Sequence, residues 1–198
     1  DISDKAKEAY KFVYSTIRRQ FPHIKILVAT YFEGLKDNLA LAASLPICAL
    51  HLDLVRAPQQ LEEVLDSIPE SLSVSLGVVD GRNIWKNDFE ASLALIKSVT
   101  TKLGAERVLI APSCSLLHSP CDLDLETNEE TLTPEIKGWL AFAKQKIDEV
   151  VVLKALALTN PTAASLETLE ANKKAIESRA TSNLIHNKQV KDRVSAIT

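Results

Sequence analysis

The sequence alternates four times between a short apolar segment and a segment whose apolar residues recur at helical spacing, and this alternation restricts the possible folds more than any other feature. The apolar segments are rich in β-branched residues and are bounded by Pro or Gly, which is typical of buried strands. The expected strands are residues 24–32, 47–55, 72–79 and 107–111, and the expected helices are residues 5–20, 35–44, 59–68, 88–103 and 133–158. Pro112 is expected to end the fourth strand, because proline has no N–H to donate to a sheet. The alternation predicts parallel β/α units.

Two α/β architectures contain such units. Four of them would make about half of a (β/α)8 TIM barrel, a fold whose usual size is ~250 residues. An open doubly wound sheet fits the same alternation, but none of the five glycines forms a phosphate-binding loop after a strand. We therefore predict an α/β fold in which about half of a (β/α)8 barrel is present.

Composition narrows the class of protein. The chain has 198 residues, of which 46% are hydrophobic and 25% charged, ordinary values for a globular chain with a buried core. A net charge of −3 gives no basic surface for nucleic acid, and no apolar run reaches the ~20 residues that span a membrane. Three cysteines, an odd number, argue against a disulfide framework and indicate a reducing, cytoplasmic location. Because the chain contains no methionine, we expect a processed product or a piece of a longer protein.

Polar residues lie at or just past the carboxyl end of each expected strand, in residues 30–34, 51–56, 80–83 and 113–118. In a (β/α)8 barrel the carboxyl ends of the strands meet at one rim, which carries the functional groups. Hydroxyls, an imidazole and a guanidinium at this rim suit hydrogen bonding to a partner loop or to ligand carboxylates. We predict that the mouth of the barrel is lined by Asp53, Arg82, Asn83, Ser113, Ser115 and His118.

The stretch SCSLLHSPCD after the fourth strand allows two further chemical interpretations. Cys114, His118 and Cys121 have the spacing C-x₃-H-x₂-C, which could begin a zinc site, but a fourth ligand of the usual type is missing nearby. Ser115, His118 and Asp122 supply the groups of a hydrolase, but there is no G-x-S-x-G motif. A buried structural thiol, with hydroxyls that bond the loop backbone, is the simpler alternative.

Several polar residues also have structural interpretations. His51 lies in the middle of an apolar run, so we expect a core or lumen histidine whose ring nitrogens are hydrogen-bonded. Asp53 and Arg56 could form a salt bridge. Arg82 and Asn83, in the sequence DGRN, form either an anion-binding or interface cluster, or a turn stabilised by its own side chains.

Four separated segments, YFEGLKDNL, LHLDLV, DGRNIW and SCSLLHSP, resemble in the same order the N-terminal barrel of cobalamin-independent methionine synthases. The resemblance extends over residues 24–198. It implies an enzyme of two face-to-face barrels that transfers a methyl group from 5-methyltetrahydrofolate polyglutamate to homocysteine without cobalamin. It further implies that residues 1–185 are the second half of the N-terminal barrel and that residues 186–198 begin the interdomain linker. Alone, this segment is expected to be inactive.

In this family, zinc in the C-terminal barrel binds the homocysteine thiolate, and its ligands follow the strands as His-x-Cys, Glu and Cys. The corresponding strand ends of this chain carry Thr30 and Phe32, then Asp53, then Cys114. Phe32 cannot coordinate a metal and threonine is a poor zinc ligand, so the resemblance implies that this segment binds no zinc. It would act as scaffold and as a wall of the cleft that faces the C-terminal barrel. Two alternatives are a structural half-barrel without ligand contacts and a barrel enzyme similar to uroporphyrinogen decarboxylase.

Overall fold

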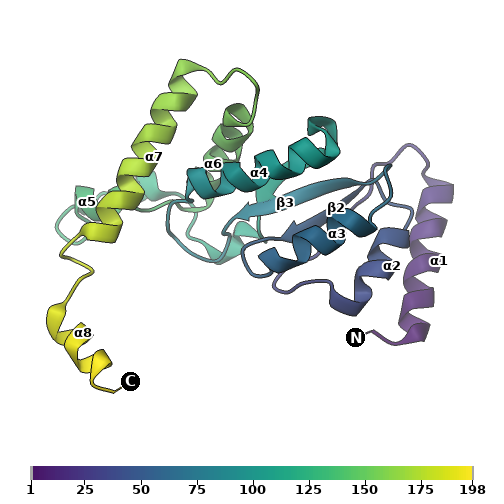
Figure 1. The fold of residues 1–198 in the computed structure, drawn as a ribbon, viewed down its shortest axis with the longest axis horizontal. Coiled ribbons are helices and arrows are strands. Elements are labelled where there is room, and N and C mark those ends of the chain that lie inside the picture. Colours follow the sequence, from purple (N-terminus) through teal and green to yellow (C-terminus); the bar gives the residue numbers. More distant parts are fainter. Residues whose placement is uncertain (1, 198) are drawn as a thin grey trace. The chain divides into compact units, whose positions relative to one another are not determined.

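The computed structural model describes residues 2–197, and Figure 1 shows their strands and helices. The strands are β1 (Leu27–Ala29), β2 (Ala49–Asp53), β3 (Ser73–Val79) and β4 (Val108–Pro112). The helices are α1 (Asp4–Gln20), α2 (Leu39–Ser44), α3 (Leu61–Ser67), α4 (Phe89–Leu103), α5 (Pro134–Gly138), α6 (Ala143–Leu156), α7 (Ala163–Thr181) and α8 (Lys188–Ser195).

The four strands form one sheet in the order β1-β2-β3-β4, and every neighbouring pair is parallel. The predicted α/β fold of four parallel strands alternating with helices is confirmed. Strand order follows chain order, as in a barrel, whereas the order of a doubly wound sheet reverses at a switch point. The sheet therefore has the topology of part of a barrel.

The chain divides into two compact units. The first contains the residues up to Asn83 together with Ala94–His118, and so holds the whole sheet. The second contains Ile84–Leu93 and the residues from Ser119 onward, which include α5 to α8. Its core includes Leu123, Leu140 and Phe142.

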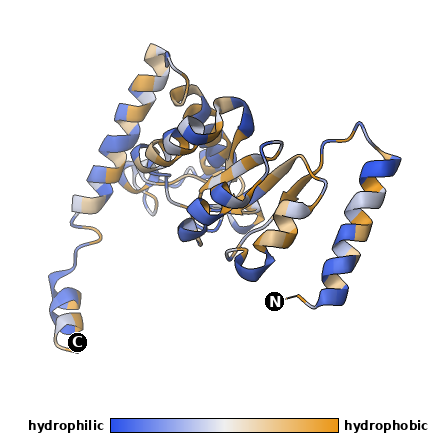
Figure 2. Ribbon diagram, turned by 45° about the vertical axis from the view of Figure 1, so that its right-hand side comes forward, coloured by the Kyte–Doolittle hydropathy of each residue, from blue (hydrophilic) through white to orange (hydrophobic). Residues whose placement is uncertain are grey.

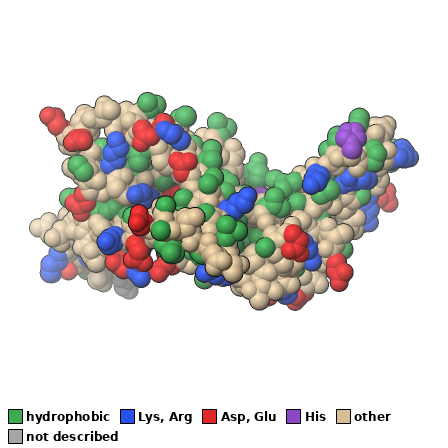
Figure 3. All heavy atoms as spheres, turned by 90° about the horizontal axis from the view of Figure 1, so that it is seen from above, with side chains coloured by type: hydrophobic (Ala, Val, Ile, Leu, Met, Phe, Trp, Pro, Cys, Tyr) green, Lys and Arg blue, Asp and Glu red, His purple; other side chains and the backbone are tan. Residues whose placement is uncertain are grey.

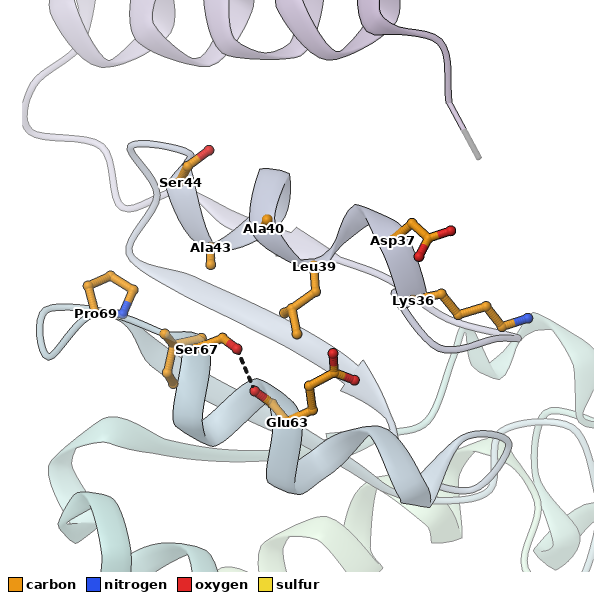
Figure 4. A pocket seen from close by; sticks show the side chains of 10 residues that line it. Lys36, Asp37, Leu39, Ala40, Ala43, Ser44, Glu63, Ser67 and Pro69 are labelled. Atoms are coloured by element: carbon orange, nitrogen blue, oxygen red, sulfur yellow. Dashed lines mark hydrogen bonds between the residues drawn. The ribbon is translucent and has the colours of Figure 1, made fainter.

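The two faces of the sheet differ in chemistry. One face presents buried aliphatic side chains, including Leu50, Leu52, Val74 and Leu76, each 0% exposed. Helices α2 and α3 contact each other and lie over the sheet (Figures 1 and 4). Successive strand residues point to opposite faces, so the other face carries His51, Asp53 and Ser75, which are also buried. These three buried polar residues therefore lie together on one face of the sheet.

The strands at the two edges differ most from expectation. β1 is three residues long rather than the predicted nine, and its Leu27 is 45% exposed. Leu109 of β4 is also 45% exposed. β4 ends at Pro112 as predicted, although Pro112 belongs to the strand and pairs with Val79 across an irregularity in the ladder. A carbonyl group remains available on proline, and the edge of the sheet tolerates its missing N–H.

Helix α1 differs from the strands of the sheet in that it contributes no residue to the buried core. Its apolar and polar residues alternate around the helix, as the striped colouring in Figure 2 shows, yet none of its residues is buried. Arg18 connects it to the rest of the first unit by donating to the backbone oxygen of Pro46 at 3.1 Å. Within residues 2–197, no helix is long and apolar enough to cross a membrane.

The single helix predicted over residues 133–158 was wrong, because two helices occupy this range. Thr133 caps α5 through the N–H of Ile136 at 3.4 Å, and Pro134 follows, as the sequence indicated. The chain then leaves the helix at Trp139, whose carbonyl accepts from Lys86 N–H at 2.9 Å. Ala141 N–H donates to the carbonyl of Ile84 at 2.8 Å. This backbone pairing replaces the helical hydrogen bonds between α5 and α6.

Candidate functional site

The candidate site lies in the first unit, where the loops after the four strands meet at one edge of the sheet. β1, β2, β3 and β4 end at Ala29, Asp53, Val79 and Pro112, and the loop residues up to Asn83 and His118 belong to the same unit. Because the strands are parallel and adjacent, their carboxyl ends form a continuous rim.

Asp53 is fully buried, with 0% of its surface exposed, and its carboxylate holds the loops of this rim in place. Its Oδ2 accepts the N–H of Phe32 at 3.0 Å, and its Oδ1 accepts the N–H groups of Val55 and Arg56 at 3.1 and 2.9 Å. The predicted salt bridge with Arg56 was wrong, since the contact is made by the backbone of Arg56. A buried carboxylate needs such donors, and three of them leave Asp53 committed to holding two loops in place.

His51 is a buried structural residue, as expected. Its Nδ1 lies 2.9 Å from Ser75 Oγ, and its Nε2 lies 3.1 Å from the carbonyl oxygen of Ser113. The ring therefore connects β2 to β3 and to the loop after β4.

Ser113 and Cys114 also serve the local structure. Ser113 is 1% exposed, and its Oγ accepts the N–H of Gly81 at 3.2 Å. The two loops approach so closely that a Cβ at position 81 would lie 2.9 Å from the carbonyl oxygen of Cys114. Burial raises the pKa of the Cys114 thiol, which keeps the thiol protonated and poorly nucleophilic.

The DGRN segment after β3 is a turn stabilised by its own side chains. Asp80 accepts the N–H of Arg82 at 2.8 Å through Oδ1 and the amide of Asn83 at 2.8 Å through Oδ2. This confirms one of the two alternatives, and the turn has a further effect, because it fixes the backbone of Arg82 beside the loop after β1.

Phe32 is the centre of the exposed part of the rim. The Arg82 guanidinium carbon lies 4.7 Å from the centroid of its ring, and the rings of His118 and Tyr31 lie at 5.7 and 4.8 Å in edge-on arrangements. We call Tyr31, Phe32, Arg82 and His118 the rim cluster. All four are exposed, so the cluster offers a cation, an imidazole and aromatic faces to a partner.

The backbone of Phe32 has a φ of 80°, which is rare for a bulky residue. Such a conformation costs of order 1–3 kcal/mol and persists only where neighbouring contacts enforce it. The Asp53 carboxylate supplies one such contact through the Phe32 N–H. Asp53 thus positions the ring against which Arg82 and His118 pack.

Of the six residues predicted for the mouth, only Arg82 and His118 present their functional groups in the rim cluster. Asp53, Asn83 and Ser113 are engaged within the chain, and Ser115 accepts the N–H of Leu117 at 3.3 Å. Tyr31 and Phe32 belong to the stretch 30–34 that was expected at the rim, but they were not among the six residues predicted for the mouth. Position after a strand was the only sequence signal that could have selected them.

The residues available do not fit a zinc site. No group of three or more His, Cys, Asp or Glu side chains among residues 2–197 could hold a metal ion. At the strand ends, Thr30 Oγ1 donates to the carbonyl of His51 at 2.7 Å, and both oxygens of Asp53 accept backbone N–H groups. Cys114 is buried and Cys121 is exposed.

The hydrolase interpretation also lacks its geometry. Ser115 Oγ is used by Leu117 N–H, and His118 packs against Phe32. The Asp122 carboxylate binds Lys144 at 2.9 Å, and this ammonium group holds the pKa of Asp122 down at about 2. The three groups are each committed to a different contact.

A large open cavity lies elsewhere in the first unit, between α2 and α3 (Figure 4). Its volume is about 830 Å³, and Glu63 and Ser67 of α3 face Leu39 and Ala43 of α2 across it. The Ser67 hydroxyl donates to the carbonyl of Glu63 at 2.7 Å.

On the face shown in Figure 3, acidic and basic side chains are interspersed, so no field of one sign attracts a highly charged partner.

Parallel β/α units in chain order, with loops gathered at the strand carboxyl ends, define a protein of the (β/α) barrel class. Residues 1–104 match the family described as cobalamin-independent synthase, N-terminal domain. The chain belongs to this family.

Relatives from distant organisms align over the whole chain. It is 53% identical over 200 residues to a protein of Flavobacterium johnsoniae and 52% identical over 199 residues to one of Cytophaga hutchinsonii, and covers 26% of each. It is 47% identical over 197 residues to a protein of Saccharomyces cerevisiae, of which it covers 25%. All three are 5-methyltetrahydropteroyltriglutamate–homocysteine methyltransferases. The chain thus spans about a quarter of the length of these relatives.

Proposed function

We propose that this chain is part of a methyltransferase that makes methionine by moving a methyl group from 5-methyltetrahydrofolate polyglutamate to homocysteine. The observation that carries the proposal is the alignment of the whole chain with methyltransferases at about half identity. In this proposal, residues 1–185 are the second half of the N-terminal barrel and residues 186–198 begin the linker to the C-terminal barrel.

The segment would contribute scaffold and a wall of the cleft between the two barrels. The rim cluster supports this role, because Arg82 and His118 lie exposed beside Phe32 at the edge where barrel proteins bind their partners. A guanidinium suits the carboxylates of a folate tail or of a partner loop, and an aromatic face adds apolar contact. The loops that carry the rim cluster would be held in position by Asp53, Asn83, Ser113 and Ser115.

The zinc that activates homocysteine would belong to the C-terminal barrel. When bound there, the metal would hold the thiol of homocysteine as a thiolate near neutral pH. This chain would supply neither a ligand nor a proton to that step. Its contribution would be the position of the folate substrate and of the opposing barrel.

Arg82→Ala and His118→Ala in the full-length polypeptide test the proposal. We expect a raised KM for the folate triglutamate, with kcat and the KM for homocysteine close to wild type, because the rim cluster would bind folate and would not activate the thiol. Lys97→Ala, which removes an exposed cation from α4, is the matched control and should leave all constants unchanged.

The second candidate function is a purely structural half-barrel. It is favoured by one observation, namely that four of the six predicted mouth residues have their polar groups engaged within the chain. In that case Arg82→Ala and His118→Ala would leave the folate KM at the wild-type value. Relatives named as methyltransferases give no support to the third alternative, an enzyme similar to uroporphyrinogen decarboxylase.

A further inference from the structure

The second unit contains a pocket of about 290 Å³ that the proposed function does not use. Apolar side chains of Phe89, Leu123, Leu140 and Val152 form part of its lining. Its volume is at the lower end of the ~300–1,000 Å³ of ordinary ligand pockets, which restricts an occupant to a small molecule.

Glu149 on α6 is the polar residue that marks this pocket as a site. Only 7% of its surface is exposed, and its Oε1 accepts the N–H of Asn87 at 2.9 Å. Its Oε2, which is also buried, has no hydrogen-bond partner among the described residues. A buried carboxylate oxygen without a donor is costly, so a residue retained in this state needs an explanation.

The surroundings of Glu149 are fixed by other buried polar groups. Lys146 is 0% exposed, and its Nζ donates to the carbonyl of Trp85 at 2.9 Å. Asn172 of α7 accepts the N–H of Phe89 at 3.1 Å and donates to the carbonyl of Asn87 at 2.8 Å. These contacts connect the walls of the pocket, so the position of Glu149 is set before any ligand arrives.

The charges around the pocket indicate the chemistry of the ligand. Glu149 presents an acceptor that suits an ammonium group, and the apolar side chains suit a short hydrocarbon chain. Two lysines favour ionised Glu149, first the buried Lys146, whose ammonium group donates to the Trp85 carbonyl, and then Lys86. Lys86 lines the pocket, so it could meet an anionic group of the ligand. Opposite charges near an apolar wall match a zwitterion better than a simple amine or a simple acid.

We propose that this pocket binds a small apolar α-amino acid, whose ammonium group donates to Glu149 Oε2 and whose carboxylate faces Lys86. The aliphatic side chain packs against Phe89, Leu140 and Val152. The proposal is independent of the proposed function, because every residue that it uses lies in the second unit.

Calorimetric titration of the chain with three matched probes tests the proposal. L-norleucine carries both charges, pentylamine lacks the carboxylate, and hexanoate lacks the ammonium group. We expect saturable binding of norleucine, weaker binding of pentylamine and no binding of hexanoate. Absence of norleucine binding at millimolar concentration, or equal binding of hexanoate, would overturn the proposal.

Glu149→Gln should weaken norleucine binding at least tenfold, because a charged hydrogen-bond acceptor is replaced by an amide. The glutamine oxygen can keep the bond to Asn87, so the fold should persist. Glu167→Gln, an exposed acid on α7, is the matched control and should bind norleucine like the wild type. Val152→Phe fills the pocket with a larger apolar side chain, leaves the Glu149 carboxylate in the chain and should also abolish binding. Wild-type affinity in either Glu149→Gln or Val152→Phe would contradict the assignment.

Discussion

Replacing Glu149 with glutamine should make the second unit more stable at neutral pH and leave its stability nearly unchanged in acid. Burial raises the pKa of this carboxyl group from 4.5 to about 6, against the opposing effects of the Asn87 N–H and of the nearby lysines. The folded chain therefore holds a proton that the unfolded chain has already released between these two pH values. Ionised Glu149 consequently lowers the stability of the folded state as the pH rises through this window.

The magnitude follows from the two pKa values, which differ by about 1.5 and so correspond to about 2 kcal/mol. Glutamine cannot ionise and retains an oxygen for the Asn87 N–H. The difference in unfolding free energy between the Glu149→Gln variant and the wild type should therefore grow by about 2 kcal/mol between pH 4.5 and pH 7.

Urea denaturation monitored by tryptophan fluorescence measures this difference in the second unit, which contains Glu149. Both tryptophans of the chain, Trp85 and Trp139, lie in the second unit together with Glu149. Glu167→Gln, on the exposed side of α7, should show a difference that does not change with pH. A Glu149→Gln difference that is equally flat, or that falls with rising pH, would show that burial does not raise the pKa of Glu149.

Three further predictions concern the rim and its supports. Gly77→Ala should destabilise the first unit by ~1–3 kcal/mol, as measured by urea denaturation monitored by circular dichroism, because its Cβ would lie 2.8 Å from the Ser113 Cα. Unchanged stability would show that the two segments do not approach so closely. Asp53→Asn should cost ~1–3 kcal/mol by the same measurement, since an amide NH₂ would face a backbone N–H, and a neutral result would show that the Asp53 carboxylate does not hold the loops of the rim in place. The chain should retain no stoichiometric zinc after dialysis, as measured by atomic absorption; retained zinc that is lost in Cys114→Ser would contradict the account of the strand ends.

The sequence was sufficient to predict the α/β class and the parallel arrangement, because four apolar runs separated by helical segments allow few other folds. It could not predict that β1 shortens to three residues, since strand length at an edge depends on the neighbouring chain. It also could not show that residues 139–141 pair with residues 84–86, a contact between segments more than fifty residues apart. The helical spacing of the apolar residues concealed that interruption.

The sequence placed the candidate residues at the strand ends, but it could not show which contacts their side chains make. Parallel strands bring their ends together, so Arg82 and His118 could be placed at one rim from the sequence alone. Phe32 was placed in the rim stretch 30–34 but given no role beyond being unable to bind metal, because its positive φ and its contact with Asp53 depend on tertiary structure. Glu149 was missed altogether, since a glutamate on a helix ordinarily lies in solvent and nothing in the local sequence indicates its burial.

Methyl transfer by the full-length polypeptide that carries this chain tests the proposed function. We predict that homocysteine and 5-methyltetrahydrofolate triglutamate yield methionine without added cobalamin, and that the double variant Arg82→Ala/His118→Ala requires more folate for half-maximal rate. Failure of the wild-type polypeptide to form methionine would contradict the proposed function. Methionine formation with an unchanged folate KM in the double variant would contradict the role of the rim cluster.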